Sequence, residues 1–241
     1  MNIAAYFASL SLPNLVSRLP GGVAQGIIWG IMALGVYITF RLLDVADLTV
    51  DGSFTTGGAV TAMLILAGWP AWAALLVAVL AGLLAGLVTG LLHTKLGIPA
   101  ILAGILTQFA LYSINLRIMG MSANKPVNPD RYRLLLTLRH IPSAILVGLI
   151  LAAALIAILY WYFGTEQGSA LRATGSNPAM SRAQGININT MKVLGLSLSN
   201  GVVALSGGLM AQYPGVTKMK RMGRATLEEL EPYLEIVKEI M

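Results

Sequence analysis

Three carboxylates interrupt an otherwise apolar stretch of the chain. Asp44, Asp47 and Asp51 are spaced DxxDxxxD, so a helix with that spacing would present them on one face. Carboxylates gathered in this way suit a hard, oxygen-seeking cation such as Mg²⁺. The residues that follow favour a second chemistry, the capping of a helix by side-chain oxygens; they are Ser53, Thr55 and Thr56.

The metal chemistry corresponds to one class of enzyme. Membrane-embedded prenyltransferases hold Mg²⁺ and a diphosphate with this acidic pattern, for which Asp44, Asp47 and Asp51 would serve here. Such enzymes need a second acidic cluster, whereas Asp130 and Glu166 are isolated in the sequence. A Mg²⁺-dependent prenyltransferase is therefore the alternative function.

The capping chemistry predicts a break between two helical segments at "LTVDGSFTTGG". Gly52 permits the turn, and the helix that follows would open its N–H groups toward the bundle, as at transporter sites for anionic groups. Two interpretations stay open. The stretch either lines a translocation path or caps a helix at the membrane interface, with Asp44 and Asp47 solvated. The path-lining candidates are Asp51, Ser53, Thr55 and Thr56.

The composition places the chain in a membrane. It is 56% hydrophobic and 11% charged with mean hydropathy +0.76, whereas soluble domains carry about 25% charged residues. The net charge of +6 lies in short loops, which suits anionic lipid headgroups better than nucleic acid. There is no cysteine, so thiolate metal sites and disulfides are excluded.

Apolar runs predict the architecture. A helix needs roughly 20 apolar residues to cross a bilayer. Runs of this kind occur at 22–40, 69–92, 98–120, 141–163 and 191–212, with a shorter one at 54–68. We expect an all-α polytopic bundle of about six membrane segments, one of them short or broken. Gly82, Gly86 and Gly90 recur every four positions, a pattern that lets helix backbones approach closely in lipid.

A second set of polar residues follows the run at 98–120. Thr107, Gln108 and Asn115 place polar atoms along this predicted span. Such residues either form hydrogen bonds between helices or line a water-filled path. We retain all three as path candidates.

A short helix is predicted in the polar loop 164–190. Asn177 is a good N-cap, Pro178 suits the first helical position, and Gly185 is a natural terminator after the last turn. The segment 179–184 between them is too short to be stable alone in water. It must be held by packing, against its own bundle or against a partner.

This loop carries a resemblance to a known family. The stretch "LRATGSNPAMSRAQGIN" resembles the cytoplasmic coupling loop of ABC-importer permeases of the branched-chain amino acid and ribose type. The stretches "DLTVDGSF", "GLLHTKLGIPAILAGILTQFALYSINLRIMG" and "LGLSLSNGVVALSGGLMAQY" are also similar to this family. The resemblance extends from about residue 22 to 214 and includes a subgroup thought to handle amino acids.

The resemblance implies a permease subunit in a bacterial cytoplasmic (inner) membrane. Its partners would be an ATPase subunit that binds ATP and Mg²⁺, an extracytoplasmic substrate-binding protein and a second permease copy. The resemblance favours an amino acid over a sugar or nucleoside as the solute. This chain would bind no cofactor itself, and it has no GxxxxGK[ST] phosphate loop. The loop 164–190 would be cytoplasmic, and 121–140 external. The coupling residues implied are Arg172, Gly175, Asn177, Pro178, Met180, Arg182, Gln184 and Gly185.

The remaining segment departs from this pattern. Residues 1–214 are expected to form the permease domain, and residues 215–241 a charged, amphipathic tail. Thr226 and Glu229 form a capping box there. A frameshift, a truncation or a fusion would each explain the change.

Overall fold

The computed structural model describes residues 12–122, 125, 127, 132, 134–136 and 141–213, with side chains from residue 19 onwards. The tail 215–241 lies outside these residues. Within them every regular element is helical, in the order α2 (Leu12–Tyr37), the π-helix η1 (Ile38–Leu42), α3 (Val50–Leu66), α4 (Ala71–Thr94), α5 (Ala100–Ile118), α6 (Ile141–Gly164), α7 (Glu166–Ser176), α8 (Pro178–Ala183) and α9 (Ile188–Gln212).

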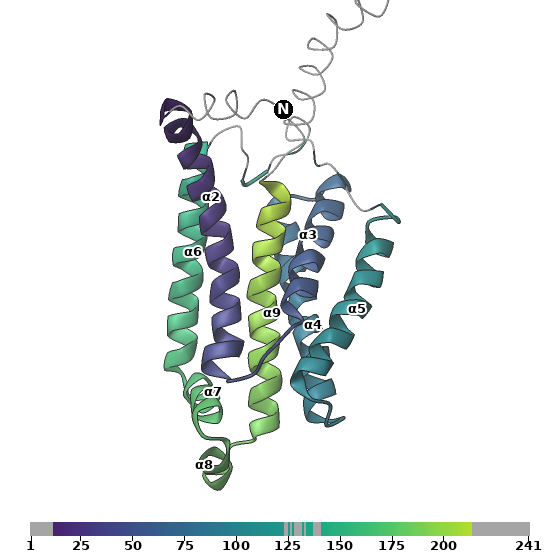
Figure 1. Ribbon diagram of the computed structural model, residues 1–241, viewed down its shortest axis with the longest axis vertical. Coiled ribbons are helices and arrows are strands. Elements are labelled where there is room, and N and C mark those ends of the chain that lie inside the picture. The colour runs from purple at the N-terminus through teal and green to yellow at the C-terminus, as the bar shows by residue number, and fades with distance from the viewer. Residues whose placement is uncertain are drawn as a thin grey trace, which may run out of the picture.

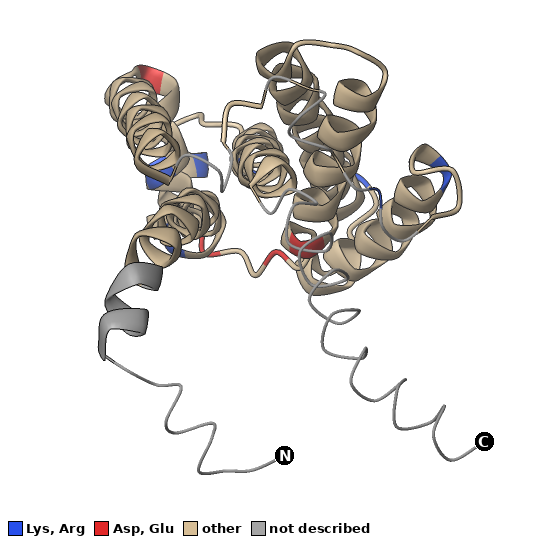
Figure 2. Cartoon of the chain, turned by 90° about the horizontal axis from the view of Figure 1, so that it is seen from above, with Lys and Arg blue, Asp and Glu red and all other residues tan. Residues whose placement is uncertain are grey.

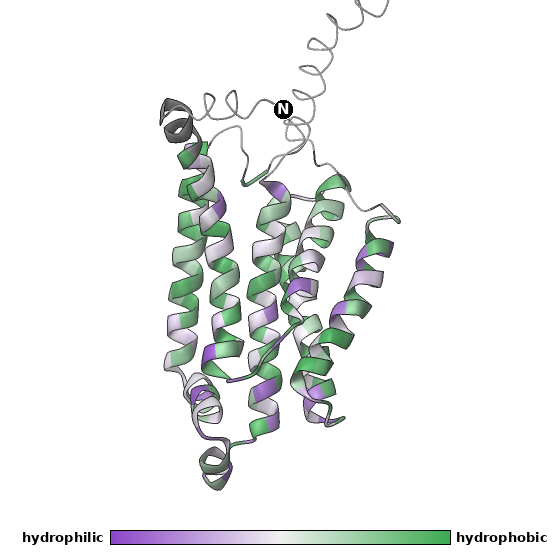
Figure 3. Ribbon diagram, viewed as in Figure 1, coloured by the Kyte–Doolittle hydropathy of each residue, from purple (hydrophilic) through white to green (hydrophobic). Residues whose placement is uncertain are grey.

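The membrane bundle expected from hydropathy is confirmed. In the described part of the chain, five helical segments are long and apolar enough to cross a membrane, and α3 is a shorter apolar helix. The five are Leu19–Leu42, Ala71–Thr94, Ala100–Ile118, Ile141–Gly164 and Ile188–Gln212. Figure 3 shows apolar residues along most of the length of these helices, with polar ones at scattered positions.

Helix α9 occupies the centre of the bundle, with α2, α3 and α4 around it (Figure 1). In the membrane-spanning part of α9, 67% of the residues are buried inside the structure, compared with 11% in α6. Small residues allow this packing. A Cβ added at Gly82 or Gly86 would collide with the backbone of α9, at Asn200 and Leu196 respectively. The glycine face predicted on α4 is therefore a helix-packing face.

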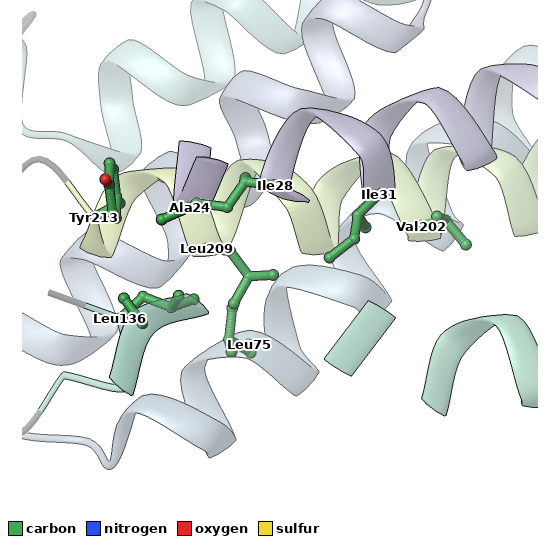
Figure 4. Packing of buried hydrophobic residues seen from close by; sticks show 9 residues of the cluster. Ala24, Ile28, Ile31, Leu75, Leu136, Val202, Leu209 and Tyr213 are labelled. Atoms are coloured by element: carbon green, nitrogen blue, oxygen red, sulfur yellow. The ribbon is translucent and has the colours of Figure 1, made fainter. Parts of the chain in front are cut away.

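Hydroxyl groups of α9 join it to its neighbours. Ser199 donates to the carbonyl of Gly35 and Ser206 to that of Ile28, both on α2 and both at 2.7 Å. Near the other end of the same pair of helices, Tyr213 donates to the Gly21 carbonyl at 2.6 Å. Apolar side chains fill the space between these contacts, as Figure 4 shows for the cluster of Ala24, Ile28, Ile31, Leu75, Leu136, Ala144, Val202, Leu209 and Tyr213.

Helices α7 and α8 project from one end of the bundle, opposite the end at which α2 begins (Figure 1). The 164–190 region therefore contains two helices, whereas only the second was expected. Thr165 is the N-cap of α7, and its side chain accepts a hydrogen bond from the Gly168 amide at 3.4 Å.

Candidate functional site

The chain breaks between α2 and α3 inside the bundle. After η1, residues 43–49 form a non-helical connection, named here the bridging segment, and α3 begins at Val50. Asp47 in this segment accepts a hydrogen bond from the Asn200 side-chain nitrogen at 2.7 Å. Because Asn200 lies at the middle of α9, Asp47 lies at the mid-depth of the bundle rather than solvated at its edge.

Side-chain hydrogen bonds extend this contact into a buried network, named here the polar centre: Asp47, Thr49, Ser53, Thr89 and Asn200. Ser53 donates to the Asn200 side-chain oxygen at 2.6 Å. The Thr49 amide donates to Asp47 at 2.8 Å, and the hydroxyls of Thr49 and Thr89 are 2.9 Å apart. Apart from Asp47, these side chains are at most 1% exposed. Irregular backbone at membrane depth requires such internal partners.

The α5 helix covers the bridging segment from another side. A Cβ added at Gly104 would lie 2.9 Å from the Leu48 amide nitrogen, and one added at Gly52 would lie 3.2 Å from Cα of Gln108. Gly52 is thus a close-packing position within α3 rather than a turn. Figure 2 shows acidic residues beside the connection between α2 and α3, while charges are sparse along the helices.

The expected capping of α3 is wrong. Helix α3 begins at Val50, one residue before Asp51, so its N-cap residue is Thr49. The Thr49 side chain makes no cap hydrogen bond. Asp51 is exposed in the first turn. Ser53 turns instead to Asn200, and the hydroxyls of Thr55 and Thr56 donate to the Gly52 carbonyl within the helix.

Two of the three polar candidates on α5, Gln108 and Asn115, lie against α3. Asn115 donates to the Thr55 hydroxyl at 3.1 Å, while its side-chain oxygen is buried without a partner. Thr107 is buried and bonds to the Ala103 carbonyl at 3.0 Å. Gln108 is half-buried beside Gly52. The contacts of Asn115 and Gln108 join α5 to α3, whereas the Thr107 bond lies within α5. Thr55 and Asp51 remain exposed next to them.

The three carboxylates do not form the metal site of the alternative interpretation. Asp44 is exposed in a left-handed conformation with φ +54°, Asp47 faces Asn200, and Asp51 belongs to α3. They lie on differently directed pieces of backbone, so helical spacing does not align them. In the part of the chain that the structure describes, no three His, Cys, Asp or Glu side chains gather as metal ligands would.

The short helix α8 has the ends predicted for it. The Asn177 side chain accepts from the Met180 amide at 3.0 Å, and Pro178 is the first helical residue. Gly185 follows with φ +81°, and the amides of Gly185 and Ile186 bond to the carbonyls of Arg182 and Ser181. This pair of bonds is a Schellman motif, which satisfies the last carbonyls of the helix.

Most of α8 is uncovered. Ser181 is buried at 3% exposure and seats the helix, whereas Met180 is 59% exposed. Met180 is thus an apolar side chain on the uncovered side of α8. The other exposed residues of the predicted coupling set in this stretch are Asn177, Pro178, Arg182, Gln184 and Gly185.

Arg172 and Gly175 belong to α7 rather than to α8. Arg172 donates from Nη2 to the Phe163 carbonyl at 3.1 Å, which fastens α7 to the end of α6. A Cβ at Gly175 would collide with the Leu42 carbonyl, so Gly175 lies directly against the end of η1.

Three members of the polar centre were missed from the sequence. Thr49, Thr89 and Asn200 were not among the site candidates, although Asn200 is a lone amide in the middle of a span rich in small residues. A polar side chain in that position is expensive in lipid, which is the signal that marks it.

Comparison with known proteins identifies the family. A profile of the family described as "Branched-chain amino acid transport system / permease component" matches residues 19–228. This range extends past position 214 into the segment expected to depart from the pattern. No solved structure matches the chain significantly.

Two curated proteins resemble the chain along most of its length. A "Tyrosine transport system permease protein" of Clostridioides difficile (strain R20291) is 43% identical over 209 residues, covering 85% of this chain and 68% of that protein. An uncharacterized protein of Rickettsia prowazekii (strain Madrid E) is 34% identical over 191 residues, covering 79% and 66%. The chain therefore spans about two thirds of the length of each relative. This is a family of transport permeases and not of enzymes, which removes the prenyltransferase alternative. On this evidence the chain is a multi-pass membrane protein that belongs to the branched-chain amino acid transport permease family.

Proposed function

We propose that this chain is the membrane subunit of an ATP-driven importer that moves an amino acid by alternating access. A separate ATPase subunit would bind α8 and supply the energy. The observation that carries the proposal is α8 itself, a capped helix of six residues that projects from one end of the bundle with Met180 exposed. A helix so short is not an independent unit, and its exposed side fits the groove of a partner.

The orientation follows from the same assignment. If α8 binds a cytoplasmic ATPase, the end of the bundle that carries α7 and α8 faces the cytoplasm, and the connection between α5 and α6 faces outward. A substrate-binding protein would then deliver the solute to the outer end.

The bridging segment and the start of α3 are the proposed translocation path. Asp51 and Thr55 are exposed close to the level of Asn200, where contact with lipid would be costly for a carboxylate. A second copy of the chain would close this face and leave the path between the two copies.

The proposed path matches the chemistry of an amino acid. An amino acid carries an ammonium group and a carboxylate. Asp47 and Asp51 provide negative charge for the first, and the amino-terminal end of α3 provides positive dipole for the second. The tyrosine transport permease among the relatives makes an amino acid the solute to test first.

The test is purification of the affinity-tagged chain from its native membrane, followed by identification of the proteins that accompany it. We expect an ATPase subunit with a phosphate loop, and ATP-dependent uptake of labelled tyrosine or another amino acid in proteoliposomes that also receive the binding protein. Met180→Glu should abolish recovery of the ATPase, because it places a charge on the apolar anchor. Asn189→Glu adds the same charge to an exposed position in the first turn of α9 and should leave recovery intact. Equal recovery with both variants would refute the role of α8.

A further inference from the structure

The bridging segment is packed against α7 at one end. Leu171 of α7 is fully buried in an apolar cluster with Leu43, Val45 and Leu196, which are 3%, 6% and 1% exposed. Leu43 and Val45 belong to the bridging segment, and Leu196 belongs to α9. This cluster therefore joins α7, the bridging segment and the central helix.

The link between α7 and α8 is a single residue. Asn177 ends α7, where its amide donates to the Ala173 carbonyl at 2.9 Å, and it caps α8 through its side chain. One residue that serves both helices holds them in a fixed relation. Gly175 lies close to the Leu42 carbonyl, so the end of α7 packs directly against η1.

The bridging segment meets the polar centre at its other end. Asp47 follows Val45 by two positions and bonds to Asn200, which lies one helical turn beyond Leu196 on α9. The apolar cluster and the polar centre are thus consecutive layers along α9, connected by the same short piece of backbone.

The backbone of the bridging segment is irregular between these layers and is tied to η1 at its start. It begins after a π-helix, a form that often marks functional positions. Asp44 has φ +54°, which marks a sharp change of chain direction. At its start the amides of Leu43 and Val45 bond back to the carbonyls of Ile38 and Thr39 in η1, both at 3.1 Å, so the segment follows η1.

We propose that the bridging segment transmits the movement of α7 and α8 to the polar centre, and that Leu171 is the positioning residue through which α7 acts on it. The inference rests on the proposed function, because the movement starts at an ATPase bound to α8. When α7 shifts relative to α9, Leu43 and Val45 follow Leu171, and the position of Asp47 relative to Asn200 changes.

The test uses Leu48→Cys as a reporter in the complex of the full chain with its ATPase subunit. Leu48 lies in the bridging segment and is 45% exposed, and the chain has no other cysteine. The labelling rate of this cysteine by a maleimide is measured without nucleotide and after trapping with ATP and vanadate. The two rates are compared in the parent, in Leu171→Ala and in Leu171→Met.

We expect nucleotide to change the labelling rate in the parent. Leu171→Ala should shrink that change by about 2- to 30-fold, the range in which substitutions alter coupling between sites. Recovery of the ATPase and its hydrolysis of ATP should persist, because α8 is untouched. Leu171→Met keeps most of the volume and should preserve the change. If Leu171→Ala does not accumulate in the membrane, Leu171→Val takes its place as the smaller truncation.

Two results would overturn the inference. One is a nucleotide-dependent change of equal size in the parent and in Leu171→Ala. The other is loss of ATPase recovery in Leu171→Ala together with the labelling change, which would make the apolar cluster only a seat for α8. Failure of the proposed function would give a different result, because no ATPase subunit would then be recovered with the unsubstituted chain.

Discussion

Helix α8 and the polar centre are held together in opposite ways. In α8, the cap and the terminator come from residues adjacent to the helix, Asn177 and Gly185. In the polar centre, the bond between Asp47 and Asn200 joins residues 153 positions apart. The first region is stabilised by its own sequence, and the second by the assembly of the whole bundle.

The difference determines how damage spreads. A substitution in α8 removes bonds that serve only α8, since most of its side chains are exposed. A substitution in the polar centre leaves buried polar groups of other helices without partners, and such groups cost more than the lost bond is worth. We therefore expect substitutions in the polar centre to affect folding, and those in α8 to affect the partner.

Two turns also contain a residue in the left-handed conformation, one just after α8 and one in the bridging segment. Gly185 has φ +81°, and no heavy atom lies within 4 Å of the position of its missing Cβ. Asp44 has φ +54° although it is not glycine. Asp is among the few residues that adopt this conformation with little strain, so the two turns use different solutions to one steric problem.

The largest effect is expected from Asn200→Leu. It removes the amide that bonds to Asp47 and the oxygen that accepts from Ser53, both in the protein interior. We expect a loss of about 3 kcal/mol, because one bond goes to a charged group and one hydroxyl is left unpaired. The measurement is thermal unfolding of the purified chain in detergent, followed by tryptophan fluorescence.

Ser197→Ala is the matched control in the same helix. Ser197 donates to the Leu83 carbonyl at 2.7 Å, a neutral bond between helices. Its removal should cost about 0.6 kcal/mol, the average found for such bonds in membrane proteins. Equal losses in Ser197→Ala and Asn200→Leu would mean that the polar centre is no different from ordinary helix packing.

A smaller and confined effect is expected from Gly185→Val. Space is free for the side chain, so the penalty is conformational and amounts to about 1–2 kcal/mol. It should fray the end of α8 and reduce ATPase recovery by about tenfold, with no change in the unfolding temperature of the bundle. Gly185→Asn tolerates this conformation and should behave as the parent. A lowered unfolding temperature in Gly185→Val would show that α8 is integrated into the bundle.

The same contrast explains what the sequence predicts. The spans follow from apolar runs and α8 from its caps, because each of these signals is contained in a short stretch. Leu171 gave no such signal, since its burial depends on Leu43 and Leu196, which meet it only in the folded chain. The stretch around Asp51 was predicted to break the helix, and the break lies a few residues earlier because Asp47 pairs with Asn200.

The smallest effect is expected from Asp44→Gly, which tests whether the turn at Asp44 in the bridging segment stores strain. Glycine relieves any cost of φ +54° in the folded state, but it also gains freedom in the unfolded state, which costs about 0.4–1 kcal/mol. Because Asp already tolerates this conformation, the two terms should nearly cancel, and the unfolding temperature should stay within error of the parent. Asp44→Val provides the scale, since a β-branched residue at this φ should lose about 1–2 kcal/mol. Clear stabilisation by Asp44→Gly would reveal strain at Asp44. Clear destabilisation would instead show that the exposed carboxylate contributes to the fold, and the two left-handed turns would then differ in kind.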